Sequence, residues 1–454
     1  MLFNLTIGVR PTASRTLGTA PFISAIAPVY HAVSWPRMRA GPLLVLVIAA
    51  CGGDGVPELE WTGTPGRGPM RLLDWTPEVE VSIDGAARHL VLDTGAPYTS
   101  VDREAFTDRN DGLADADVGL LGIDARLEIS TFDVFGPGGG PTDGLLGADV
   151  LGAFALELDY RAGEAAFHTT GEAVAAPADA TPVDLTAWVL GGGRTLVPGC
   201  GSTCGSLRIG PTRVIVEAHV EGLDERVYAL IDTGASGVLV RDRLLARLDA
   251  LESRPRPRLP GLQVAAVGGV IDGALVRLWR IGLASPEVRD GETVPFDDVW
   301  AMDLPGLGLF DAIEDEVGVE VDLLIGGSLL RAAQVVVDEP ASTLRFAPYA
   351  TTPHIPVDEF HAVGFTLGDA GGVWIVTAVT PGTDAEAKGL SEGDQVDVIA
   401  GTSITGVDAA AVDALFAPYH LGDVVPITFS PSGGAATSVE IQVEDLLPSF
   451  PPPG

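Results

Sequence analysis

The 454-residue sequence has one lysine, three cysteines and few aromatic residues, which make up 6% of the chain. Positive charge is scarce as well: 27 basic residues stand against 62 acidic ones, so the formal net charge is −35. Nucleic acids and anionic lipid surfaces repel a chain of this charge, and we expect neither as a partner. The charge is best interpreted as a solubility feature.

Signatures of cofactor and metal chemistry are also missing. The seven histidines show no metal-ligand spacing, and the sequence contains neither a Walker loop nor a dinucleotide fingerprint. No serine or cysteine stands in a recognisable nucleophile motif. We therefore expect no cofactor and no metal.

The composition favours a chain rich in strands and turns. Hydrophobic residues make up 46% of it, enough for a substantial core, and 57 glycines with 34 prolines suit short strands and tight turns. The length allows two to four domains.

Two copies of one short stretch are the clearest feature of the sequence. An apolar strand runs into Asp-Thr-Gly at residues 93–95 and again at residues 232–234. A single Asp-Thr-Gly is typical of a hairpin turn and would carry little weight. A second shared block, at residues 143–151 and 322–330, follows the two copies.

The second block continues as a longer internal repeat. Asp143 and Asp322 are 179 residues apart, and so are Phe167 and Phe346, so no gap interrupts the repeat between them. Upstream, residues 79–85 match residues 216–222, both with strand alternation followed by a turn. The repeat predicts two similar units in tandem.

These motifs resemble those of the aspartic proteases, in particular the retropepsin-like family. The resemblance implies a mainly β fold with two β-barrel lobes that form a pseudo-twofold pair. It also implies that Asp93 and Asp232 meet, share one proton and activate a water molecule. The glycines of the loops allow a close approach and the threonines hydrogen-bond across, so the expected supporting residues are Thr94, Gly95, Thr233 and Gly234.

The function expected from this resemblance is an aspartic-type endopeptidase acting on a protein or peptide substrate. One alternative is a catalytically silent protease fold that serves as a binding scaffold. Another is that each lobe pairs with its twin in a second molecule. Both Asp-Thr-Gly copies are intact, which favours the enzyme, because a scaffold has no chemical need for paired aspartates.

Residues 264–276 suggest two strands around a turn at Gly268 and Gly269. In retropepsin-like proteins the matching place holds the flap, a hairpin that closes over substrate. An ordinary surface hairpin is the alternative.

Residues 355–449 resemble a PDZ domain, a small β-barrel with two short helices. Val363, Gly364 and Phe365 correspond to its carboxylate-binding loop, and residues 383–396 and 407–416 to its helices and the intervening turn. The resemblance implies that peptide C-termini bind beside this loop as an added strand. Alternatively, the domain only packs on the lobes.

The stretch 38–54 has a basic start, a short apolar run and the ending Ile-Ala-Ala-Cys. It resembles a bacterial lipoprotein signal in which Cys51 is lipidated. The resemblance implies a protein of the bacterial cell envelope, facing the periplasm or the exterior, with a lipid anchor and a true start at Met38. The apolar run is too short to span a bilayer, which takes roughly 20 residues. A long signal or a stray buried cysteine is the alternative.

The expected organisation is a signal segment (1–50), a tether (51–69), lobe one (70–170), a linker (171–210), lobe two (211–350) and the PDZ domain (355–449). The linker contains Cys200 and Cys204. In an oxidising compartment these two are expected to form a small local disulfide, with two free surface thiols as the alternative.

Overall fold

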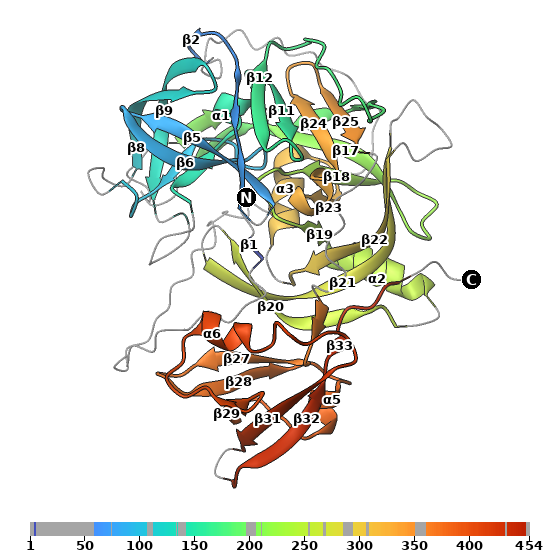
Figure 1. Ribbon diagram of the computed structural model, residues 1–454. Coiled ribbons are helices and arrows are strands. Elements are labelled where there is room, and N and C mark those ends of the chain that lie inside the picture. The colour runs from blue at the N-terminus through green and yellow to red at the C-terminus, as the bar shows by residue number, and fades with distance from the viewer. Residues whose placement is uncertain are drawn as a thin grey trace, which may run out of the picture.

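The structure is a computed structural model, and it is mainly β. Two β-rich lobes lie together and a smaller third unit lies beside the second (Figure 1). The described residues are 4–5, 59–73, 75–106, 112–132, 134, 142–196, 206–209, 211–252, 255–266, 269–284, 294–305, 308–349, 360–431 and 434–450. Cys51, Cys200, Cys204 and Gly268 lie outside them.

Lobe one is built on an eight-stranded sheet in which the main order is β2-β9-β7-β10-β6-β5-β4 and β8 pairs with β5 and β9. Alternate residues of β5, such as Val79, Val81 and Ile83, are buried, as the sequence alternation predicts. The strands are β2 (Trp61–Gly63), β4 (Arg71–Leu73), β5 (Thr76–Ile83), β6 (Ala86–Leu92), β7 (Ser100–Asp102), β8 (Gly112–Leu120), β9 (Ile123–Phe132) and β10 (Gly144–Leu146).

Lobe two is built on a nine-stranded sheet in the order β1-β20-β21-β22-β19-β23-β18-β17-β14. Two helices, α2 (Asp242–Leu251) and α3 (Leu309–Val317), belong to the same lobe. The strands are β1 (Asn4–Leu5), β14 (Trp188–Leu190), β17 (Arg213–Val220), β18 (Val227–Ile231), β19 (Val238–Val240), β20 (Arg258–Ala266), β21 (Gly269–Ala284), β22 (Val294–Asp303) and β23 (Val321–Ile325).

The two lobes share one arrangement around the Asp-Thr-Gly loops. In lobe one β10 runs parallel to β6 and antiparallel to β7. In lobe two β23 runs parallel to β18 and antiparallel to β19. Each of these central strands then enters a one-turn helix, α1 (Ala148–Leu151) or α4 (Gly327–Leu330). The sequence repeat is therefore a repeat of topology.

A six-stranded sheet in the order β13-β25-β24-β11-β12-β3 joins the lobes. At its centre β11 pairs antiparallel with β24, and Glu157 lies opposite Val336, its counterpart 179 residues later in the repeat. The register is symmetric about this pair, so a pseudo-twofold axis passes through it. The strands are β3 (Arg67–Pro69), β11 (Ala155–Asp159), β12 (Glu164–His168), β13 (Val183–Thr186), β24 (Ala333–Asp338) and β25 (Thr343–Pro348).

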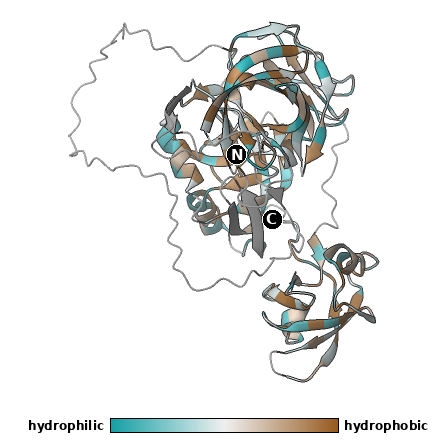
Figure 2. Cartoon of the chain, turned by 90° about the vertical axis from the view of Figure 1, so that its left-hand side faces the viewer, coloured by the Kyte–Doolittle hydropathy of each residue, from teal (hydrophilic) through white to brown (hydrophobic). Residues whose placement is uncertain are grey.

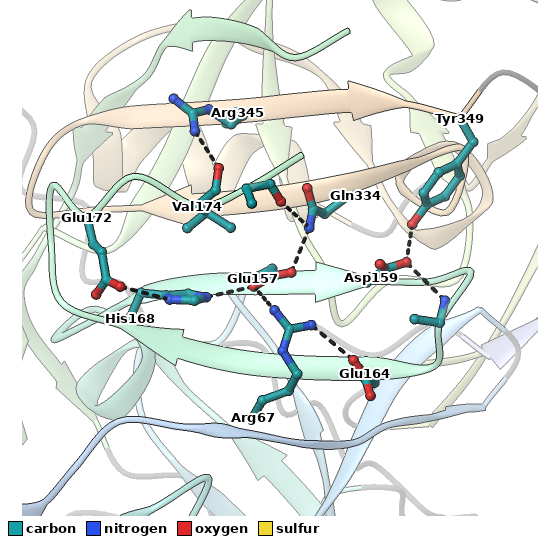
Figure 3. Close-up of polar contacts among 12 residues, drawn as sticks. Arg67, Glu157, Asp159, Glu164, His168, Glu172, Val174, Gln334, Arg345 and Tyr349 are labelled. Carbon is teal, nitrogen blue, oxygen red and sulfur yellow. Dashed lines mark hydrogen bonds and ion pairs between the residues drawn. The ribbon is translucent and has the colours of Figure 1, made fainter. Parts of the chain in front are cut away.

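The two faces of this sheet differ. One face sends Leu156 and Val335 into a core that both lobes share. The other carries the fully buried Glu157, which accepts hydrogen bonds from Arg67 Nη2 (2.5 Å) and Gln334 Nε2 (2.6 Å) and lies 2.7 Å from His168 Nε2 (Figure 3). A buried carboxylate with three partners is satisfied, and this one connects strands of both lobes.

The segment between the lobes is bound to them along much of its length. β13 pairs with β25 and β14 pairs with β17, while β15 (Gly193–Leu196) and β16 (Ser206–Ile209) pair with each other. Ala175 O accepts from Gln334 Nε2, and Gly171 N donates to Asp338 Oδ2 at 2.7 Å. Residues 61–63 and 67–69, assigned above to the tether, form β2 and β3.

The third unit has its own core around Trp374 and Val412, and it lies apart from lobe one in both overall views (Figures 1 and 2). Its main sheet has the order β27-β28-β29-β31-β32, with β30 on β29. The elements are β26 (His361–Ala362), β27 (Phe365–Asp369), β28 (Trp374–Val379), α5 (Asp384–Ala387), β29 (Gln395–Ile399), β30 (Thr402–Ser403), α6 (Ala409–Ala414), β31 (Val424–Ser430), β32 (Thr437–Gln442) and β33 (Glu444–Asp445).

Both ends of the third unit attach to lobe two. Strands β26 and β33 pair, and Leu446 N donates to Phe360 O beside them. Phe360 and Leu447 are buried in a hydrophobic cluster of lobe two that includes Trp300. The unit is thus joined to β21 and β22, the strands that support the hairpin of lobe two.

Candidate active site

The two Asp-Thr-Gly loops meet at the centre of the molecule. Asp93 follows β6 and Asp232 follows β18, both are fully buried, and their carboxyl groups hydrogen-bond to each other. A Cβ atom on Gly95 would overlap the Asp232 carboxyl, and one on Gly234 would overlap the Asp93 carboxyl. Only glycine permits this approach, so the sequence motif is explained by the contact it makes.

Crossed hydrogen bonds of the threonines lock the loops together. Thr94 N donates to Thr233 Oγ1 and Thr233 N donates to Thr94 Oγ1, each at 3.1 Å. Thr94 Oγ1 in turn donates to Ile231 O at 3.0 Å, and Thr233 Oγ1 donates to Leu92 O at 2.6 Å. Each hydroxyl therefore binds the strand that leads into the opposite aspartate.

Backbone donors fix the carboxyl groups. Gly95 N donates to Asp93 Oδ1 at 2.8 Å, and Gly234 N donates to Asp232 Oδ1 at 2.9 Å. The equivalence of the two contacts follows from the shared topology. It leaves the two carboxyls facing each other with similar support from their own loops.

Burial, followed by the charge and hydrogen bond of Asp93, raises the pKa of Asp232 to about 7. Two carboxylates this close cannot both ionise, because burial and mutual repulsion disfavour a second charge. The pair therefore holds one proton near neutral pH. A shared proton supplies an acid and a base at one place.

Beside the loops lies an ion pair that the sequence analysis missed. Arg213, at the start of β17, donates through Nη1 to Gly95 O and through Nε and Nη2 to Glu316 on α3, at 2.8–3.0 Å. Its position corresponds to Thr76 at the start of β5. An arginine in one copy where the other has threonine was a signal available in the repeat.

Glu339, which directly follows β24, is a second group that the sequence did not single out. It is 7% exposed, and its Oε1 has no hydrogen-bond partner. Burial raises its pKa to about 8, and Arg213 opposes the shift. The side chain is thus neutral at neutral pH.

Strands β20 and β21 form the hairpin of lobe two, and residues 267–268 at its turn lie outside the described residues. Ala266 pairs with Gly269 across its end, so Gly269 begins β21, while Gly268 falls outside the described residues. In lobe one β8 corresponds to β21 and β9 to β22, because β8 pairs with β5 as β21 pairs with β17, and β9 runs parallel to β7 as β22 does to β19. The lobe-one counterpart of the β20–β21 turn would therefore precede β8, where residues 107–111 lie outside the described residues.

In the third unit Val363 and Gly364 directly precede β27, which begins at Phe365. Gly364 has φ +73°, and a Cβ there would meet Thr383 Oγ1 at 2.6 Å, so the position requires glycine. β27 is an edge strand of its sheet in the part of the chain that the structure describes. The Phe365 ring packs on Phe416, just after α6, at a centroid distance of 6.3 Å.

Within the described ranges, no group of three or more histidine, cysteine, aspartate or glutamate side chains is placed to hold a metal ion. No helix in those ranges has the length and apolarity to cross a bilayer.

No protein-family model matches the chain, and no curated protein matches it. Among solved structures, the chain matches the photosystem II D1 C-terminal processing protease with 20% sequence identity and a TM-score of 0.18. The match covers 19% of this chain and 23% of that protein, so the chain corresponds to under a quarter of its length. Similarity of this extent carries no argument, and the functional case depends on the site itself.

Proposed function

We propose that the protein is an aspartic-type endopeptidase of the retropepsin-like kind, with Asp93 and Asp232 as its catalytic pair. The observation that carries the proposal is the pair of Asp-Thr-Gly loops, held face to face with their carboxyls hydrogen-bonded. The symmetric support of the loops argues against a coincidental contact of two turns.

The chemistry follows from one shared proton. A water molecule between the carboxyls gives a proton to the ionised member while its oxygen attacks the peptide carbonyl carbon. The protonated member donates to the carbonyl oxygen, which gives a tetrahedral diol. When the carbon–nitrogen bond breaks, the protonated carboxyl donates its proton to the leaving nitrogen and the ionised carboxyl takes a proton from a diol hydroxyl, so the pair returns to its one-proton state.

The third unit is proposed to be a PDZ domain that binds peptide C-termini. The edge strand β27, the left-handed Gly364 and the nearby α6 support this role, because an extended peptide can add to a free edge beside a helix. Attachment to β21 and β22 gives the unit a route to regulate substrate access. Gly364→Val should abolish binding of C-terminal peptides to the full chain, whereas Gly371→Ala, in a surface turn, should not.

The protein is further proposed to be a lipoprotein of the bacterial cell envelope, anchored through Cys51 and facing the periplasm or the exterior. The Leu-rich run that ends in Ala-Ala-Cys is the support for this proposal. Cys51→Ala should move the protein from the membrane fraction to the soluble fraction. Unchanged membrane association of the variant would contradict the anchor.

Incubation of the purified chain with an unfolded protein from pH 4 to pH 8 tests the enzyme. We expect peptide fragments with the wild type and none with Asp232→Asn. Exposed Asp117, 75% accessible, provides the matched control, and Asp117→Asn should cleave normally. Peptide binding without cleavage would instead favour the alternative, a silent scaffold.

A further inference from the structure

One residue, Gly95, separates the guanidinium of Arg213 from the candidate aspartate pair. Arg213 belongs to lobe two, yet it donates to Gly95 O in the catalytic loop of lobe one. Gly95 is itself packed directly against the Asp232 carboxyl. The Gly95 backbone is therefore held between Arg213 on one side and Asp232 on the other.

Glu316 determines where this guanidinium points. Two bonds of 3.0 Å from Nε and one of 2.8 Å from Nη2 join Arg213 to the Glu316 carboxylate. The two side chains are 13% and 21% exposed, so solvent screens their field only in part. A fork-to-carboxylate contact of this kind fixes orientation as well as charge.

The arrangement breaks the symmetry of the site. β5 and β17 have the same length and correspond residue by residue, which places Thr76 where lobe two has Arg213. Thr76 is fully buried and donates to Leu73 O, so its hydroxyl is used locally. The cation thus acts on one side of the pseudo-twofold axis.

We propose that Arg213, oriented by Glu316, is a positioning residue of the dyad that holds the Gly95 loop and sets the pH range in which the aspartates share one proton. This inference rests on the proposed peptidase function. Arg213 is not a member of either Asp-Thr-Gly loop. It acts on the aspartates through its hydrogen bond to the Gly95 peptide and through the electric field of its charge.

The charged groups around Arg213 determine in which direction each substitution should shift the ionisation of the two aspartates. Glu316 faces it from α3, the two aspartates lie beyond Gly95, and Glu339 lies within its electrostatic reach. Removing the cation leaves the Glu316 carboxylate unpaired, so both changes disfavour ionised aspartates. Removing the Glu316 charge instead leaves the cation unopposed, which favours them.

The test compares pH profiles of kcat/KM for four variants with that of the wild type. Arg213→Gln should move both limbs of the profile to higher pH by about half a unit or more. Glu316→Gln should move them to lower pH, and the double variant should return close to the wild-type position. Arg213→Lys should keep the limbs in place while kcat falls, because the charge stays but the fork is lost.

Arg241→Gln is the matched control. Arg241 is also a partly buried arginine paired with acids of α3, Asp311 and Glu314, but its other contact is Val321 O rather than a catalytic loop. Its replacement should leave both limbs unmoved. Lower rates with coincident limbs in all the Arg213 and Glu316 variants would overturn the proposal, because a structural role alone predicts that result.

A second readout separates this inference from the peptidase proposal. The pH dependence of thermal unfolding reports the Asp232 titration without any substrate. If the wild type cleaves nothing, the peptidase proposal fails, and the same opposite shifts in the unfolding profile still support a field set by Arg213. Coincident unfolding profiles would overturn it.

Discussion

Thr94 and Thr233 exchange hydrogen bonds, each donating its backbone N–H to the other's hydroxyl at 3.1 Å. The contact is reciprocal, so neither loop can move without breaking a bond at the other. Because both residues are buried, water cannot replace a lost partner. The geometry of the aspartate pair thus depends on the two threonine side chains.

Thr233→Val is therefore expected to be costly. It leaves Leu92 O and Thr94 N without partners in a buried site, and each unsatisfied group costs about 1–3 kcal/mol. We expect the free energy of unfolding, measured by urea denaturation, to fall by about 2–4 kcal/mol. Thr233→Ser keeps the hydroxyl and should retain most of the stability. Equal losses in the two variants would show that the hydroxyl is not responsible.

Replacing either aspartate distinguishes a pair within one chain from a pair between chains. We expect Asp93→Asn and Asp232→Asn each to lower kcat/KM at least about 1,000-fold, nearly as much as both together. Mixing the two variants should restore nothing, because no molecule then contains an intact pair. In the homodimer alternative Asp93→Asn stays active and activity falls on dilution. An active Asp93→Asn enzyme would therefore rule out the single-chain dyad.

The raised pKa of Asp232 predicts how activity and stability change with pH. The one-proton state is lost as pH rises through about 7, so kcat/KM should fall there. The ordinary value of this carboxyl is 3.8, so its contribution to stability is complete below that pH and is lost as pH rises through the folded value of about 7. Thermal unfolding from pH 3 to pH 9 measures the effect, and Asp232→Asn should flatten it.

Glu339→Gln should stabilise the protein in alkali. Burial raises the pKa of Glu339 from 4.5 to about 8, so its proton favours the folded state only in acid, and this stability disappears as pH rises through 8. Glutamine stays neutral and needs no proton. We expect a gain of a few kcal/mol, roughly, in the free energy of unfolding at pH 8 and little gain at pH 4. A gain independent of pH would contradict a titration of Glu339.

The chain end that follows β33 predicts a link between the third unit and lobe two. Phe450 is 2% exposed under Arg256, its N–H donates to Asp298 Oδ1, and Ser449 Oγ donates to Asp298 Oδ2 at 2.7 Å. Phe450→Ala should destabilise β21 and β22 by about 3 kcal/mol, measured as faster amide exchange there. Phe416→Ala, within the third unit, should affect exchange in that unit instead. Identical exchange maps for the two variants would contradict the link.

Particular residues show which features of the fold and of the candidate site could be predicted from the sequence. The two Asp-Thr-Gly copies predicted a mainly β chain with two similar units, and the structure confirms a mainly β, two-lobed arrangement with paired loops. The unbroken 179-residue offset of the repeat also makes Glu157 and Val336 counterparts, although the sequence did not single out either residue. Local patterns of this kind are visible because strand alternation and glycine requirements act over a few residues.

Other features depend on contacts between distant segments, which no local pattern encodes. Arg213 reads as an ordinary strand residue until the fold brings Gly95 and Glu316 to it, more than 100 residues away on each side. Glu339 reads as an exposed turn residue beside a proline. Burial, rather than residue type, makes these two side chains important.

The two residues on the pseudo-twofold axis, Glu157 and Val336, also bear on which lobes can pair through this sheet. Glu157 faces Val336, so the single buried carboxylate there has Arg67, His168 and Gln334 as its partners. Two copies of lobe one joined in this way would bring two glutamates together on the axis without Gln334, which belongs to lobe two. Because like charges repel strongly when buried, such a self-complex is disfavoured. The Glu157–Val336 position therefore favours pairing of lobe one with lobe two over a self-pair.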